Sequence, residues 1–175
     1  GTDTRSHRWN LLDAVHREPH LRVGEIQAIG QVLYPTEHVK DAFWNESARN
    51  LFLGLCLYLI ETPTLPCSLG ELLRQASGKG QPIKDYVTGL INKRGIGDPP
   101  LSDECTRALQ RFCTTSDNTM AGILATFTAP LTIFSNPIVD AATSATDIDL
   151  SAVRKRRMAI YVGIPANRLS EAALL

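Results

Sequence analysis

Apolar residues recur every three or four positions along most of this chain, the spacing that places them on one face of a helix. Ile83, Val87, Leu90 and Ile91 show it most clearly, at positions i, i+4, i+7 and i+8. The pattern predicts an all-α fold, an irregular bundle of about six or seven helices. We expect a bend at Pro130, because proline lacks the N–H that a helix interior needs. The predicted helices cover residues 23–33, 36–61, 68–77, 82–94, 102–113 and 116–134, with a short one beginning at Asn136.

Polar caps set the predicted helix boundaries. We expect Thr36 to cap the longest helix. The second half of this helix, from Leu51 to Ile60, is apolar on all sides, which marks it as the helix that the others pack around. Ser68 and Glu71 have the spacing of a capping box, in which the serine hydroxyl accepts from the glutamate N–H and the carboxylate reaches back. Such a box contributes about 1 kcal/mol to the start of a helix.

Residues 158–164 (MAIYVGI) differ from the rest, because a short apolar run with β-branched and aromatic residues is typical of a buried strand. A lone strand has no partner for its backbone hydrogen bonds and is not stable in water. The sequence therefore predicts a helical insertion from a larger protein. Its C-terminal strand-like segment would belong to the α/β domain of that host.

The composition fits one domain with a hydrophobic core, since 43% of the 175 residues are hydrophobic. The net charge of zero argues against a surface that binds nucleic acid as a whole. The charge is unevenly distributed, because residues 72–97 contain five basic residues and only Asp85 as an acid. We call six residues of this region the basic stretch: Arg74, Lys79, Lys84, Tyr86, Lys93 and Arg94.

Two interpretations of the basic stretch are open. It is either a solvated helix face or a docking surface for single-stranded nucleic acid or an acidic protein tail, with Tyr86 able to stack on a base. A second basic cluster precedes the strand-like segment. It could bind nucleic acid, or it could contact a domain junction or a neighbouring subunit. Its members are Arg154, Lys155, Arg156 and Arg157.

The sequence shows no catalytic or metal-binding constellation. Gly78 and Lys79 suggest a phosphate-binding loop, but Leu73 and Gly80 stand where that motif needs a glycine and a hydroxyl. The cysteines lack CxxC pairing and the histidines lack the spacing of a zinc site, so we expect reduced core cysteines in a cytosolic protein, no metal site and no catalysis. No signal peptide is visible, and the longest apolar run is about half of the roughly 20 residues that span a bilayer.

Three stretches together resemble the type IV coupling proteins, the ring ATPases that bring DNA–protein complexes or effectors to type IV secretion machines. The first is residues 8–13 (RWNLLD), similar to an aromatic-Asn-Pro-Leu-Asp signature with Leu11 in place of the proline. The second is residues 43–52 (FWNESARNLF), and the third runs from Ser135 through residues 142–150 to Pro165. They span nearly the whole chain in the family's order, which is more specific than one short motif.

The resemblance implies that the chain is an all-alpha domain inserted into a nucleotide-binding domain. Residues 1–15 would arrive from the ATPase core, residues 16–147 would form the substrate-recognition domain, and residues 148–175 would return to the core. ATP and magnesium would bind only in the full-length parent, a hexameric P-loop ATPase anchored in the bacterial inner membrane, so this domain would be cytoplasmic and without a cofactor. Residues at the domain junction would be Trp9, Asn10, Arg154, Lys155, Arg156 and Arg157.

The resemblance favours a domain that docks effector signal regions or relaxase–DNA complexes and presents them to the ATPase and the secretion channel. Two alternatives remain open. One is direct binding of single-stranded DNA through the basic stretch, and the other is a stand-alone helical enzyme or transcription regulator. We expect the chain by itself to be a monomer, because ring assembly in the family relies largely on the ATPase domain.

Overall fold

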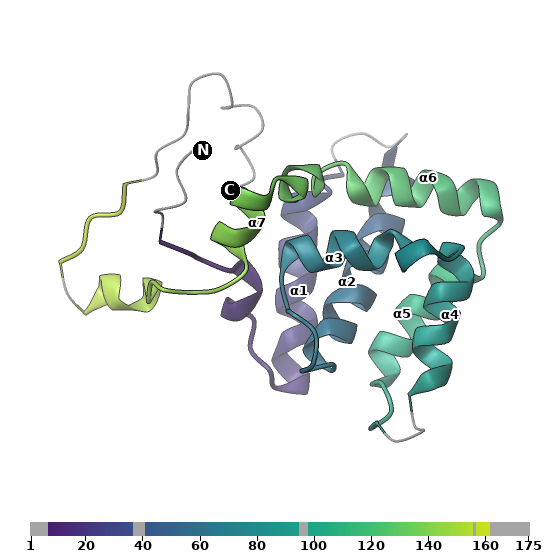
Figure 1. Ribbon diagram of the computed structural model, residues 1–175, viewed down its shortest axis with the longest axis horizontal. Helices are drawn as coiled ribbons and strands as arrows, with labels where there is room; N and C mark the ends of the chain where they lie inside the picture. The colour runs from purple at the N-terminus through teal and green to yellow at the C-terminus, as the bar shows by residue number, and fades with distance from the viewer. Residues whose placement is uncertain (1–6, 37–40, 95–97, 156, 162–175) are drawn as a thin grey trace.

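The computed structural model describes residues 7–36, 41–94, 98–155 and 157–161, and every regular element among them is a helix. The all-α prediction is confirmed, with seven α-helices in these residues (Figure 1). They are α1 (Pro19–Leu33), α2 (Ala42–Ile60), α3 (Leu69–Ala76), α4 (Ile83–Lys93), α5 (Asp103–Cys113), α6 (Asp117–Thr128) and α7 (Pro137–Thr143). Short 3-10 helices are η1 (Leu11–Ala14), η3 (Gly78–Gly80), η4 (Thr132–Ser135) and η5 (Leu150–Arg154).

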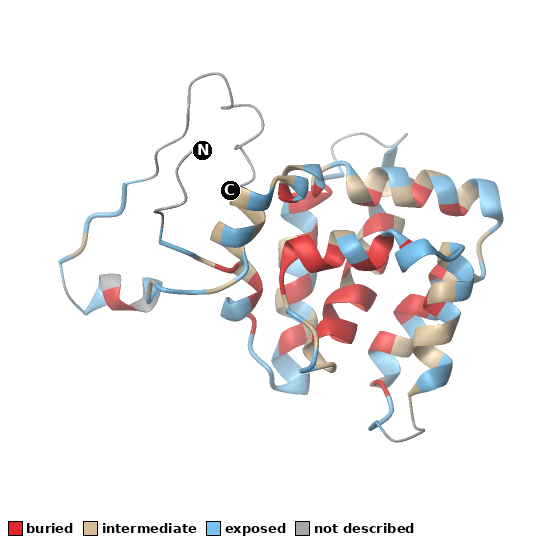
Figure 2. Ribbon diagram, viewed as in Figure 1, coloured by how far each residue is buried: buried red, intermediate tan, exposed pale blue. Residues whose placement is uncertain are grey.

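Helix α2 lies at the centre of the bundle and packs against α1, α3, α5 and α6. From Leu51 to Leu59 its residues are buried, apart from Leu53, which is partly exposed. Figure 2 shows the buried residues gathered on α2 and on the faces of the helices around it. The predicted role of this helix is confirmed, because a segment that is apolar on every side loses most water contact when it is surrounded.

Two helices begin at residues other than those predicted. Helix α1 starts at Pro19, because proline suits the first turn, where its missing N–H is not needed and its φ is already helical. The prediction that Thr36 caps α2 was wrong, since the N-cap is Asp41. The Thr36 hydroxyl instead accepts a hydrogen bond from Arg49 on α2 at 2.5 Å. Residues 37–40 lie outside the described part of the chain.

Serine caps form at the predicted starts of α3 and α5. Ser68 Oγ accepts from the backbone N–H of Glu71 at 3.2 Å, and Ser102 Oγ accepts from Cys105 at 3.3 Å. The other half of the capping box does not form. The Glu71 carboxylate turns away from the helix start and accepts from Arg74 and Gln75 at 2.6 Å each.

Pro130 ends α6 instead of bending it. The helix stops at Thr128, and η4 begins at Thr132 after a turn. A proline nitrogen cannot donate to the carbonyl four residues earlier, so the ladder of helical hydrogen bonds stops there. Leu131 and Phe134 are buried, because the chain turns inward after the break.

Gly54 allows α2 and α5 to approach closely. A Cβ atom at this position would lie 2.9 Å from Cδ2 of Leu109 and 3.2 Å from Cβ of Ala108. At this close approach the Cys105 thiol also reaches the Gly54 carbonyl, at 3.4 Å. The packing of the two helices therefore depends on the missing side chain.

Residues 158–161, the first part of the predicted strand, form no strand, and Ile160 and Tyr161 are exposed. The rest of that prediction, residues 162–164, lies outside the described residues. The described residues contain no strand, so residues 158–161 have no neighbouring strand with which to form backbone hydrogen bonds.

Candidate functional site

Two members of the basic stretch are held by carboxylates. Arg74 Nε donates to Glu71 Oε2 at 2.6 Å, and its Nη1 donates to Asp140 Oδ2 at 2.7 Å. Lys79 Nζ lies 3.4 Å from Glu71 Oε1. Burial raises the pKa of Glu71, but hydrogen bonds from Arg74 and Gln75 and the charges of Arg74 and Lys79 outweigh it, so the pKa is lowered. Glu71 is therefore ionised and forms ion pairs with both Arg74 and Lys79.

The polar ends of Tyr86 and Arg94 are also bound within the bundle. The Tyr86 hydroxyl donates to Gln75 Oε1, and burial raises the pKa of Tyr86 to about 12, so the hydroxyl keeps its proton. A guanidinium nitrogen of Arg94 donates to the carbonyl of Glu61 at the end of α2. A positive charge at this place also interacts favourably with the helix dipole.

Lys84 and Lys93 are the members of the basic stretch that remain free. Both are exposed on α4, and neither forms an ion pair with another described residue. The structure therefore does not bring the six residues together as one cationic face. A binding role of the basic stretch stays a prediction that now depends on these two lysines.

The incoming and outgoing segments of the bundle are joined side by side at one end (Figure 1). Arg8 binds the Asp147 carboxylate through its backbone N–H at 3.2 Å, its Nε at 3.0 Å and its Nη2 at 2.9 Å. These hydrogen bonds lower the pKa of Asp147 to about 2. The Asp147 N–H donates to the Arg8 carbonyl, and the Trp9 N–H donates to the Ala142 carbonyl, both at 2.9 Å. We call this set of contacts the clasp; its members are Arg8, Trp9, Asn10, Asp13, Ala142, Thr146 and Asp147.

Asn10 is the buried centre of the clasp, with 2% of its surface exposed. Its Nδ2 donates to the Cys67 carbonyl at 2.7 Å and to Asp13 Oδ1 at 3.0 Å, and its Oδ1 accepts from the Leu12 N–H at 3.1 Å. Its backbone N–H donates to Thr146 Oγ1 at 3.2 Å, and Thr146 donates to Asp13 Oδ2 at 2.7 Å. One residue thus ties the incoming segment to the loop before α3 and to the outgoing segment.

The sequence singled out Trp9 and Asn10 for a domain junction, and both belong to the clasp. It did not point to the pairing of Asn10 with Thr146 or of Arg8 with Asp147, because these contacts join residues 136 and 139 positions apart. The junction role itself stays a prediction. Of the other predicted junction residues, Arg154, Lys155 and Arg157 are exposed, and Arg156 lies outside the described residues.

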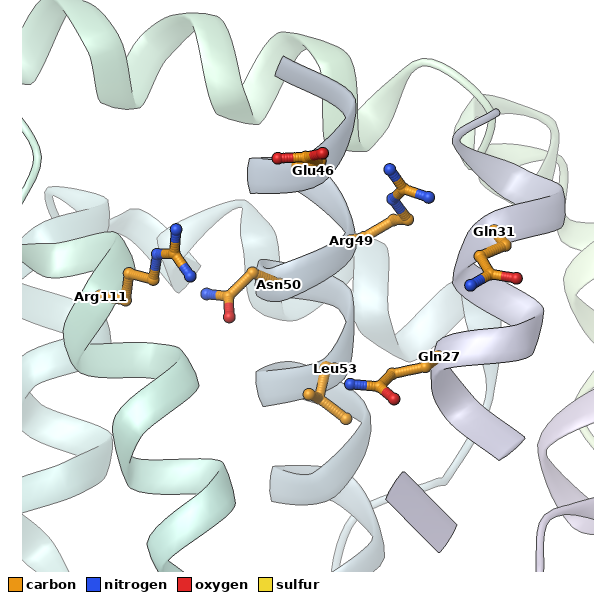
Figure 3. Close-up of a pocket in the computed structure, with 7 residues that line it drawn as sticks. All are labelled: Gln27, Gln31, Glu46, Arg49, Asn50, Leu53 and Arg111. Carbon is orange, nitrogen blue, oxygen red and sulfur yellow. The ribbon is translucent and has the colours of Figure 1, made fainter. Parts of the chain in front are cut away.

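A polar groove of about 350 Å³ runs along α2 between α1 and α5 (Figure 3). Three carboxamides, two guanidinium groups, one carboxylate and one leucine line it. Helix α6 lies at the top of both Figure 1 and Figure 3, but α1 is to the left of α5 in Figure 1 and to its right in Figure 3. Figure 3 therefore views the molecule from behind, and the groove opens on the face that points away from the viewer in Figure 1. The lining residues are Gln27 and Gln31 of α1, Glu46, Arg49, Asn50 and Leu53 of α2, and Arg111 of α5.

None of these lining residues was predicted as a binding residue, although Glu46, Arg49 and Asn50 lie in residues 43–52, one of the stretches that carry the resemblance. The signal that could have found them is the spacing of Glu46, Arg49, Asn50 and Leu53, which lie three and four positions apart on one face of α2. That face is polar at three of four positions although the second half of the helix is apolar. A polar stripe on a central helix indicates a surface that the bundle leaves uncovered.

The described residues contain no group of three or more His, Cys, Asp or Glu side chains that could hold a metal ion. Within them, no helix is both long enough and apolar enough to cross a membrane. Cys56 and Cys105 are buried free thiols, and burial raises the pKa of both, that of Cys105 to about 12. These two thiols are therefore not nucleophiles near neutral pH.

The family model described as "Type IV secretory system Conjugative DNA transfer" matches residues 2–175. No curated protein and no solved structure matches the chain. The matched range includes the bundle, the clasp and the groove.

Proposed function

Because the chain belongs to the type IV secretory system family of conjugative DNA transfer, we propose that its helical bundle, residues 16–147, is a recognition domain that docks the cargo of the transfer machine. The cargo in this proposal is a protein, either a relaxase attached to DNA or an effector with a signal region. Residues 1–15 and 148–175 connect the bundle to the nucleotide-binding domain of a coupling ATPase. ATP and magnesium act in that domain, which passes the cargo to the secretion channel.

The clasp is the observation that carries this proposal. A domain inserted into another domain must bring its incoming and outgoing segments close together. Arg8 and Asp147 do this across 139 positions of sequence. A bundle held by two adjacent segments keeps the remainder of its surface free for a partner, which supports a recognition role.

A second candidate function is binding of single-stranded DNA through the basic stretch, which Lys84 and Lys93 favour because both are free. Each phosphate that a protein neutralises on a single strand contributes about −0.7 to the slope of log K against log salt. Two lysines therefore predict a slope of about −1.4. A slope near zero excludes this function.

The test titrates the full chain with a purified relaxase and with an effector of the same secretion system, using calorimetry at two salt concentrations. Saturable binding that weakens with salt is expected, because charged groups on both partners contribute to docking. An oligothymidine is titrated in parallel. If the chain is folded by circular dichroism but binds neither the relaxase nor any effector, the proposal is wrong.

A further inference from the structure

Several polar groups of the groove between α1, α2 and α5 have no partner inside the bundle. The side chains of Gln27, Gln31, Glu46 and Arg111 form no hydrogen bond or ion pair with another described residue. We infer that the groove binds an extended, acidic peptide segment of the cargo, whose carboxylates pair with Arg49 and Arg111. This inference rests on the proposed function and adds to it the surface and the chemistry of recognition.

The charge of the groove favours a carboxylate ligand. Two guanidinium groups against the one carboxylate of Glu46 leave a net charge of +1. Figure 3 shows the Arg111 side chain extending from α5 toward Asn50 on α2. Arg49 donates one N–H to Thr36 Oγ1 at 2.5 Å, which orients its guanidinium group while its other donors stay available. Guanidinium groups pair with carboxylates through two parallel hydrogen bonds, which adds geometric selectivity.

The carboxamides suit a peptide backbone. The Asn50 amide nitrogen donates to the Ala108 carbonyl at 2.9 Å, which fixes the side chain and leaves its oxygen free to accept a peptide N–H. Gln27 and Gln31 lie one turn apart on α1, and each offers both donors and an acceptor. Four residues of helix rise about 6.0 Å, close to the roughly 6.7 Å that two residues of extended chain span. Alternate residues of an extended peptide therefore meet successive turns of α1 and α2.

The size and lining of the groove argue against other ligands. Its volume of about 350 Å³ lies at the lower end of the roughly 300–1,000 Å³ that binding pockets span, so it accepts a few residues of chain and not a folded domain. Among the described residues no aromatic side chain lines it, so these residues offer no surface on which bases can stack. Leu53 supplies one apolar contact for a side chain of the peptide. These features fit a short acidic segment better than a nucleic acid strand.

The experiment measures fluorescence anisotropy of a labelled synthetic peptide of about ten residues, which reaches roughly 33 Å when extended. The peptide alternates Ser and Glu and ends in a free carboxylate. Its uncharged counterpart has Gln for Glu and an amidated end, and an oligothymidine of similar length reports binding of DNA. The full chain is compared with Arg111→Glu and with Arg17→Glu. Arg17 is the matched control, because it is also an exposed arginine but lies before α1, outside the groove.

We expect Arg111→Glu to weaken binding of the acidic peptide at least about tenfold, since a charge-assisted pair is replaced by a repulsive one. Arg17→Glu changes the net charge equally and should alter the affinity by less than about twofold, because Arg17 lies outside the groove and solvent and salt screen exposed charges. The uncharged peptide should bind more weakly and respond to neither variant. Equal weakening by both variants overturns the assignment to the groove. The assignment is also overturned if the chain binds the oligothymidine more tightly than the acidic peptide and Arg111→Glu abolishes that binding of DNA.

Binding of the relaxase or the effector by the chain, measured for the unaltered protein and for Arg111→Glu, distinguishes this inference from the proposed function. Capture that survives Arg111→Glu removes the groove as the docking surface and leaves the recognition role. If the unaltered chain captures neither protein while the peptide result holds, the recognition role fails and the specificity for acidic peptides stands. Arg111 is exposed, so the variant is expected to unfold at the same urea concentration as the unaltered chain.

Discussion

Replacing Gly70 by alanine would place a methyl group inside the carboxylate of Asp140. A Cβ atom at position 70 would lie 1.9 Å from Asp140 Oδ1 and 2.7 Å from its Cγ, so the side chain must move. Asp140 also accepts from Arg74 Nη1 at 2.7 Å, and its Oδ1 is buried without a hydrogen-bond partner. The substitution therefore disturbs the contact that holds α7 on α3.

The expected loss of stability follows from three effects. A hydrogen bond to a charged group contributes about 1.5–3 kcal/mol, with the lower end applying here because the Arg74 side chain is 48% exposed. Overpacking costs about 1–3 kcal/mol, and part of this cost is the same displacement of Asp140. Alanine is favoured over glycine in a helix by up to about 1 kcal/mol. The net result is a loss of about 1–2 kcal/mol, which lowers the urea midpoint by about 0.5–1 M at an m value near 2 kcal/mol/M.

Urea unfolding followed by circular dichroism measures this effect in a double-mutant cycle. In an Asp140→Ala background the opposing carboxylate is absent, so Gly70→Ala should become neutral or stabilising, with a coupling energy of about 1–3 kcal/mol. Gly24→Ala in α1 is the control, since its Cβ would meet nothing within 4 Å, and it should stabilise the chain by up to about 1 kcal/mol. If Gly70→Ala raises the midpoint as Gly24→Ala does, with Asp140 in place, the reasoning is refuted.

Two further predictions concern buried and charged hydrogen bonds. Tyr34→Phe should destabilise the chain by about 1–2 kcal/mol in urea unfolding, because the buried Tyr34 hydroxyl donates to the Phe127 carbonyl at 2.9 Å and the substitution leaves that carbonyl unpaired; an unchanged midpoint would contradict this. The pKa of Asp147, lowered to about 2 by hydrogen bonds from Arg8, means that its contribution is complete above about pH 4 and is lost as the pH falls through 2. Between pH 4 and pH 2 the urea midpoint of Asp147→Asn should therefore fall less than that of the unaltered chain, and parallel pH profiles would argue against the clasp.

The helices could be predicted from the sequence because their signals are local. Ser68 and Ser102 cap α3 and α5 through contacts with residues three positions away, and the apolar positions of α5 follow one helix face. The errors came where two local signals compete. Thr36 is a good cap residue, but α2 begins only at Ala42. Pro130 stops a helix, whereas its neighbours continue the apolar pattern.

Charge pairing could not be predicted from the sequence. Arg74 and Arg111 each lie on a helix with apolar neighbours at helical spacing; Glu71, three positions before Arg74, is a local sign of pairing, but nothing local points to Asp140. In the structure, Arg74 is bound by Glu71 and by Asp140, which is 66 positions away, while Arg111 is free at the rim of the groove. The basic stretch therefore looked like the binding surface, although four of its six members are bound within the bundle.

The sequence by itself determined the all-helical class, the central place of the helix with the apolar run from Leu51 to Ile60, and the resemblance that the family match confirms. Only the tertiary structure decided which polar groups face each other, as in the clasp between Arg8 and Asp147. The physical reason is the range of the interactions. Helix formation depends on contacts within about four residues, whereas a hydrogen bond or an ion pair depends on distance in space, whatever the separation along the chain.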